Sequence, residues 1–284
     1  MPVHRLVDSH LHLWAKTRDS HAWIQPGTQL DRAFTARDAE LQLREAAVDQ
    51  VILVQADQTP EDTDFLLDMA RENSWVLGVV GWGPIFAPTE LAHELERWRD
   101  QPLLRGLRLR CDRAESEKYG EPPQRSLQLL AEHGLTIDVL SRGSAGLVSA
   151  CSFAARLPSQ PVVLNHLGRP PFGAADFVEW RAAIAQFALF DNTYAKISGL
   201  AGCLAPDQEF RADNLRPAWE AALESFGPQR IMFGGDWPVS TRFASYQSTI
   251  DVLGALIDEL TEDERALIWG ETAQRAYRVT RVRA

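Results

Sequence analysis

Eight short apolar runs, each followed by a stretch with helical patterning, limit the folds open to this chain of 284 residues. Branched aliphatic side chains within the runs indicate strands. We predict strands at residues 6–12, 48–56, 75–82, 103–110, 135–141, 161–167, 192–200 and 230–237. Strands that begin roughly 30 residues apart, with a helix after each, are typical of βα units and of a parallel sheet.

Several of the intervening helices have recognisable ends. Thr59, which precedes a proline, is a predicted N-cap, and Thr261 with Glu264 forms a predicted capping box. Thr89 is expected to start one helix, and Gly134 is expected to end another. These signals place helices between the strands, as the βα pattern requires.

Eight βα units in one chain of this length favour a closed (β/α)8 barrel of the TIM type over an open sheet. The alternative is a doubly wound sheet, but no GxGxxG turn follows an early strand. No linker or charge block divides the chain, so we expect a single domain over residues 1–284. The segments 15–33 and 201–213 follow predicted strands and would lie at the barrel mouth.

Composition excludes several classes of partner. The chain has 39 acidic and 29 basic residues, a net charge of −10, which argues against binding to nucleic acid or to an anionic membrane. Cys111, Cys151 and Cys203 form no CxxC pair, so neither a disulfide framework nor a thiolate zinc site is expected. No apolar run approaches the roughly 20 residues of a membrane span, and no signal region opens the sequence. We therefore expect a cytoplasmic monomer or homodimer.

Four polar residues stand at predicted carboxyl ends of strands, where barrel enzymes carry their chemistry. In VDSHLHLW, residues 7–14, His10 and His12 would point to the same face of a strand. His166 ends the sixth predicted strand and Asp236 the eighth. Singly, each has an ordinary structural explanation. Together they suit one divalent ion, such as Zn²⁺, with room for a water molecule, and they predict hydrolysis of an ester, lactone or amide.

The order of motifs along the chain resembles the amidohydrolase superfamily, specifically its amidohydrolase-related lactonase branch. That branch includes sugar lactonases such as L-fuconolactonase as well as 2-pyrone-4,6-dicarboxylate lactonase. The motifs, in order, are DSHLHLW, VILVQADQTPEDTDFLLDMA, VVGW, LRGLRLR, LNHLGRP, AKISGL and FGGDWPV. The resemblance implies a (β/α)8 barrel, attack of water on a lactone carbonyl, and a cluster of His10, His12, His166 and Asp236.

Departures from the superfamily pattern limit the metal content. Members with two metals also use a Lys or Glu on strand four and a His on strand five. Here strand four offers three arginines and strand five offers Thr136 and Asp138, so we expect one ion at most. The branch also includes members that work without metal, and the sequence does not separate these cases. Asn165 replaces the usual Asp before the strand-six His, and Lys196 is interpreted as a hydrogen-bonding residue of the barrel.

Substrate binding is predicted to involve strand four first. Arg108 and Arg110 share a face, and guanidinium groups bind carboxylates and polarise carbonyls. Arg108 matches the family's Gly-aliphatic-Arg motif, so the resemblance implies that it acts in catalysis with Asp236 and His166. Arg142 and Arg169 follow strands and are candidates for binding a substrate carboxylate.

Further binding candidates follow other strand ends. Gln55 and Asp57 share the face at the end of strand two, and Asp57 is the better placed to reach substrate. Trp14, Trp82 and Trp237 are predicted to form aromatic walls for a sugar ring, with packing under the loops as the alternative.

These features predict a hydrolase that opens a lactone, with a sugar 1,4-lactone preferred as substrate. The alternatives are a lactonase for a dicarboxylated pyrone or a muconolactone, and a metal-dependent decarboxylase, which release of carbon dioxide would distinguish. A binding protein without activity is the remaining reading, and the intact set of His10, His12, His166 and Asp236 argues against it.

Overall fold

The computed structural model describes residues 5–16, 20–111, 119–173 and 175–279. All eight predicted strands are present, and they form one parallel sheet in sequence order. The strands are β1 (Val7–Leu11), β2 (Gln50–Val54), β3 (Val76–Gly81), β4 (Leu104–Cys111), β5 (Thr136–Ser141), β6 (Val162–Leu164), β7 (Thr193–Ile197) and β8 (Ile231–Phe233).

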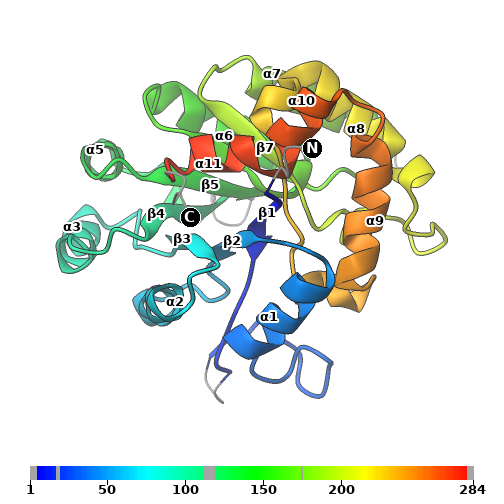
Figure 1. The fold of residues 1–284 in the computed structure, drawn as a ribbon. Coiled ribbons are helices and arrows are strands. Elements are labelled where there is room, and N and C mark those ends of the chain that lie inside the picture. Colours follow the sequence, from blue (N-terminus) through cyan, green and yellow to red (C-terminus); the bar gives the residue numbers. More distant parts are fainter. Residues whose placement is uncertain (1–4, 17–19, 112–118, 174, 280–284) are drawn as a thin grey trace.

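Helices follow the strands, and most of them lie outside the strands, around the barrel (Figure 1). They are α1 (Ala36–Glu45), α2 (Pro60–Glu72), α3 (Pro88–Arg97), α5 (Gln124–Glu132), α6 (Gly143–Arg156), α7 (Phe177–Ala188), α8 (Ala212–Phe226), α9 (Tyr246–Ile257), α10 (Glu262–Ala266) and α11 (Thr272–Ala276). This is the predicted (β/α)8 barrel, and it excludes the doubly wound sheet.

The predicted helix ends are confirmed with one exception. The Thr59 side chain accepts a bond from the Asp62 amide, and Thr261 forms its capping box with Glu264. The start expected at Thr89 is wrong, because α3 begins at Pro88 and has no side-chain cap. Proline is tolerated at the first helical position without a side-chain cap, because an N–H at that position would have no partner within the helix.

The barrel closes where the chain beyond β8 meets β1. The Gly235 amide donates to Asp8 Oδ1 at 2.8 Å, and the Tyr246 hydroxyl donates to Asp8 Oδ2 at 2.7 Å. The Ser9 hydroxyl also donates to the Phe233 carbonyl oxygen. Asp8, the first polar residue of the VDSHLHLW stretch, therefore joins the first and last strands.

Apolar side chains fill the barrel interior, which is a packed core and not a pore. Residues of several strands, among them Val54, Val80 and Met232, form one buried cluster with Tyr277 from the end of α11. A larger apolar layer lies between the strands and the surrounding helices. None of the helices in the described residues combines the length and apolar surface that crossing a membrane requires. The barrel is thus a rigid scaffold whose interior combines this apolar packing with the buried Asp138 and Lys196 side chains.

Candidate active site

Backbone hydrogen bonds at the barrel seam bring Asp236 to the predicted histidines of the first strand. The Asp236 amide donates to the His10 carbonyl oxygen and the His12 amide donates to the Trp237 carbonyl oxygen, each at 2.7 Å. Asp236 Oδ1 lies 3.7 Å from His10 Nε2 and 3.3 Å from His12 Nε2. The segment after β8 and the end of β1 thus meet at one corner of the mouth. The Gly235–Asp8 bond joins residues of these segments that are 227 positions apart in sequence.

His166 completes the corner from an unusual backbone conformation. After β6 the chain turns through four consecutive residues with positive φ, from His166 at 55° to Arg169 at 59°. Asp236 also has a φ of 55°. Positive φ in a residue other than glycine costs of order 1–3 kcal/mol, and such conformations cluster at functional sites. The turn ends β6 early and directs His166 toward His10, with ring centroids 4.6 Å apart.

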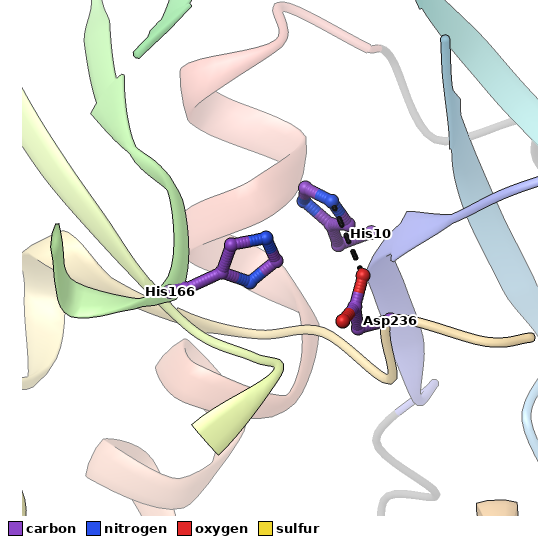
Figure 2. A group of neighbouring side chains, drawn as sticks. All are labelled: His10, His166 and Asp236. Carbon is purple, nitrogen blue, oxygen red and sulfur yellow. Dashed lines mark ion pairs between the residues drawn. The ribbon is translucent and has the colours of Figure 1, made fainter. Parts of the chain in front are cut away.

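The donor atoms of His10, His166 and Asp236 all lie within 4.8 Å of one another, as Figure 2 shows for the side chains. Ligands of a tetrahedral zinc ion with bonds of about 2.0–2.1 Å lie about 3.3 Å apart, so the set has suitable dimensions for one ion. His10 Nε2 is buried and has no hydrogen-bond partner. These residues therefore fit a divalent metal.

His12 supports the same conclusion through its tautomer. Its Nδ1 lies 2.7 Å from the Val54 carbonyl oxygen, which can only accept, so Nδ1 carries the proton. Its Nε2 faces Asp236 Oδ1 across 3.3 Å, a separation at which the two atoms share either a proton or a cation. His12 is thus placed to contribute to the corner, although it lies outside the tight group of three.

Burial sets the protonation states of the corner. Desolvation lowers the pKa of His10 well below its usual value and lowers that of His166 to about 4, so both rings are neutral near pH 7. Burial raises the pKa of Asp236, but the nearby imidazoles and the Arg108 guanidinium outweigh burial and hold this pKa below its usual value. Neutral imidazoles beside an ionised carboxylate are the forms that bind a metal.

A buried charged network supports His10 from within the barrel. Lys196 Nζ lies 2.6 Å from Asp138 Oδ2 and 3.3 Å from His10 Nδ1. Asn165 donates to Asp138 Oδ2 at 2.9 Å, and the Tyr277 hydroxyl donates to Oδ1 at 2.6 Å. Lys196 is thus a hydrogen-bonding residue of the barrel, as predicted, and Asn165 orients Asp138.

A cavity of about 490 Å³ opens beside this corner. Most predicted binding residues reach it: Arg108 and Arg110 from β4, Asp57 after β2, Arg142 after β5 and Arg169 after β6. His12, His166 and Asp236 line its floor. The cavity also contains Gln55, whose buried Oε1 has no hydrogen-bond partner, while Arg108 Nε is likewise buried and unpaired. Both atoms are available to a bound molecule.

The predicted tryptophan walls are not brought to this cavity as a group. Trp14 is fully buried and Trp237 is 4% exposed, and both pack against Phe34. Trp82 borders a smaller neighbouring cavity that also includes Arg108 and Arg110.

Trp23 was missed, and it supplies the aromatic wall instead. It is 44% exposed, lines the cavity, and donates from Nε1 to the Ala56 carbonyl oxygen at 2.7 Å. Its only sequence signal was its place in the segment 15–33, expected at the mouth. Arg242, in the short helix after Trp237, was missed as well.

The family model for amidohydrolases matches residues 7–279. The chain belongs to the amidohydrolase family. The family predicted from the motifs is therefore confirmed. Among curated proteins, this amidohydrolase is 33% identical to an L-fucono-1,5-lactonase of Burkholderia multivorans over 95% of each chain. It is 29% identical to an L-fucono-1,5-lactonase of Burkholderia ambifaria, over 97% of this chain and 96% of the relative.

Among solved structures, this amidohydrolase is similar to a zinc-bound amidohydrolase from Burkholderia multivorans. The TM-score is 0.88 and the sequence identity is 31%, over 97% of this chain and the whole of the other. The two chains therefore share one fold over nearly their whole length.

Proposed function

We propose that the protein hydrolyses the lactone of a sugar acid at the barrel mouth. The observation that carries this proposal is the convergence of His10, His166 and Asp236 beside a cavity that His166, Asp236 and Arg108 line. The two L-fucono-1,5-lactonases support it, because each aligns with nearly the whole chain. Their names give a 1,5-lactone, so the 1,4-lactone expected from the sequence stays a prediction alongside it.

The metal of this proposal is a single divalent ion, and zinc is our first candidate. His10, His166 and Asp236 would hold it, with His12 beside them. A bound ion lowers the pKa of water toward about 7 and polarises a carbonyl oxygen. A second ion has no ligands on β4 or β5, where Asp138 already pairs with Lys196.

The protein's own groups have distinct roles in ring opening. The pKa of Asp236 is held below its usual value, so its carboxylate is ionised near pH 7. This carboxylate accepts a proton from the attacking water. Arg108 donates one bond to the Gln55 carbonyl oxygen at 2.6 Å and keeps its buried Nε for the lactone oxygen as negative charge develops there. Burial lowers the Arg108 pKa only to about 10, so the guanidinium remains charged near pH 7.

A pH-indicator screen of 1,4- and 1,5-aldonolactones, run with and without chelator, tests the proposal. We expect acid release from at least one of them, and a loss of at least a hundredfold in kcat for Asp236→Asn with an unchanged circular dichroism spectrum. Near-normal turnover by this variant would remove Asp236 from the mechanism. Carbon dioxide release from a carboxylated substrate would instead identify a decarboxylase.

Metal content gives a second, independent prediction. We expect one equivalent of divalent metal or less in the purified protein, because the described residues offer one ligand cluster. Elemental analysis is the measurement, with Asp236→Asn as the comparison. Two equivalents would contradict the ligand set.

A further inference from the structure

The mouth of this acidic protein is locally basic. Five arginines line the cavity, Arg108, Arg110, Arg142, Arg169 and Arg242, against two carboxylates. Of the carboxylates, Asp236 faces the histidines, and Asp57 accepts backbone bonds from His21 at 2.8 Å and from Gln58 at 3.0 Å. The cavity therefore has an excess of positive charge in a chain whose net charge is −10.

Three of these arginines form no ion pair with any carboxylate of the described residues: Arg142, Arg169 and Arg242. Arginines on the outside of the barrel commonly do, as Arg97 does with Asp64 and Arg216 with Glu259. We call Arg142, Arg169 and Arg242 the arginine rim. A guanidinium without a carboxylate partner, beside a cavity, is available to bind an anion bidentately.

The arginine rim comes from three different loops that border the same cavity. Arg169 has a φ of 59° and donates to the Gly202 carbonyl oxygen at 3.3 Å. Arg242 lies over the Phe243 ring, 5.0 Å from its centroid. Burial raises the pKa of the Cys203 thiol to about 11, against the opposing effect of both Arg169 and Arg142.

The rim is separate from the group assigned to the reacting carbonyl. Arg108 extends from β4, bonds to the Gln55 backbone and has a buried, unpaired Nε beside the catalytic corner. The buried Gln55 Oε1, also unpaired, can accept a bond from a ring hydroxyl. A lactone ring would therefore bind Arg108 and Gln55. The arginine rim would then be free to bind a further substituent of the same substrate.

We propose that the substrate is an acidic lactone, which carries, besides the reacting ester, a second anionic oxygen group that the arginine rim binds. This inference rests on the proposed lactonase function and narrows it. The class comprises lactones of sugar diacids, whose group is a carboxylate, and lactones of sugar phosphates. An L-fuconolactone lies outside this class, because it has an uncharged methyl group in place of the second anionic group.

Matched lactone pairs that differ only in oxidation of the terminal carbon test the proposal, for example glucono- against glucaro-1,4-lactone and galactono- against galactaro-1,4-lactone. We expect kcat/KM at least tenfold higher for the acidic member of a pair, mainly through KM. Its KM should rise with ionic strength, since salt screens exposed charges. Comparison of kcat/KM for 6-phosphogluconolactone with that for the diacid lactones shows whether the rim prefers a phosphate or a carboxylate.

The variants Arg142→Gln and Arg169→Gln should each lower the acidic-to-neutral preference about tenfold. The matched control is Arg181→Gln, which removes an exposed arginine of α7 that pairs with Glu224 outside the cavity, and it should leave the preference unchanged. Equal or better hydrolysis of the neutral lactones by the wild-type protein would overturn the inference and leave the lactonase proposal standing.

Binding without turnover separates the remaining outcomes. By titration calorimetry, the open-chain diacid should bind at least tenfold more tightly than the matching monoacid, and Arg142→Gln should remove the difference. Tight diacid binding without hydrolysis of any lactone would support the rim and overturn the lactonase proposal. Equal affinity for diacid and monoacid would overturn the proposal that the arginine rim binds a second anionic group.

Discussion

His166 and Asp236 hold left-handed backbone conformations, each with a φ of 55°, and so depend on their surroundings to stay in place. Gly199, in the turn after β7, lies directly beneath both side chains. A Cβ atom at Gly199 would come within 2.7 Å of His166 Nδ1 and 2.8 Å of Asp236 Oδ2. The empty space at this glycine therefore lets the two groups approach each other.

Gly199→Ala should lower kcat/KM at least a hundredfold, because the added methyl group displaces His166 and Asp236. Stability should fall by about 1–2 kcal/mol because Gly199 has a φ of 61°. Gly120→Ala is the matched control, since Gly120 has a similar φ of 68° but no atom within 4 Å of the new methyl group. Equal activity losses in the two variants, measured on the same lactone, would show that displacement of the site is not the cause.

At this scale the sequence predicted the site through strand alternation and strand ends. His10 and His12 share a face because the side chains of a strand alternate, and Arg108 and Arg110 follow the same rule. Alternation does not predict which indole reaches the mouth. Trp14 is buried against Phe34, whereas Trp23 is exposed and donates to the Ala56 carbonyl oxygen, and neither contact follows from the local sequence.

Among the elements, the strands were predicted in full, but most are shorter than expected. β6 ends at Leu164 because the left-handed turn begins two residues later, and β8 ends at Phe233 because Gly234 and Gly235 follow. Apolar runs indicate where a strand lies, but they continue into turns whose conformation depends on contacts from other strands. The same limit applies to Trp23 after β1, because its position depends on a bond to Ala56, which follows β2.

Trp23 gives a prediction for that loop. Trp23→Ala should raise the KM of the lactone substrate about tenfold, because an exposed indole face beside a sugar ring is lost. Trp23→Phe keeps an aromatic face and loses only the 2.7 Å bond to Ala56, so its KM should change about threefold or less. Steady-state kinetics on one lactone measure both. An unchanged KM in Trp23→Ala would remove this wall from the binding site.

Across the whole molecule, one buried carboxylate links the two ends of the barrel axis. Asp138 faces Lys196 and Asn165 on the side of the catalytic corner and accepts from Tyr277 at the end of α11. The fold class followed from the count of βα units, but this connection did not, because it joins residues that are 139 positions apart.

Tyr277→Phe removes one donor from this fully buried carboxylate. We expect the free energy of unfolding to fall by about 1.5–3 kcal/mol, the range for hydrogen bonds to charged groups. Urea denaturation measures the loss. A change below about 0.5 kcal/mol would mean that Asp138 finds another donor or that the bond contributes nothing net.

The seam between β8 and β1 also determines when activity can arise during synthesis. His10 and His12 leave the ribosome long before Asp236 and the Tyr246 hydroxyl that secures Asp8. A nascent chain that stops before residue 236 carries the imidazoles without their carboxylate. The protein can therefore begin its chemistry only after synthesis has passed the eighth strand and Asp236 has joined the imidazoles.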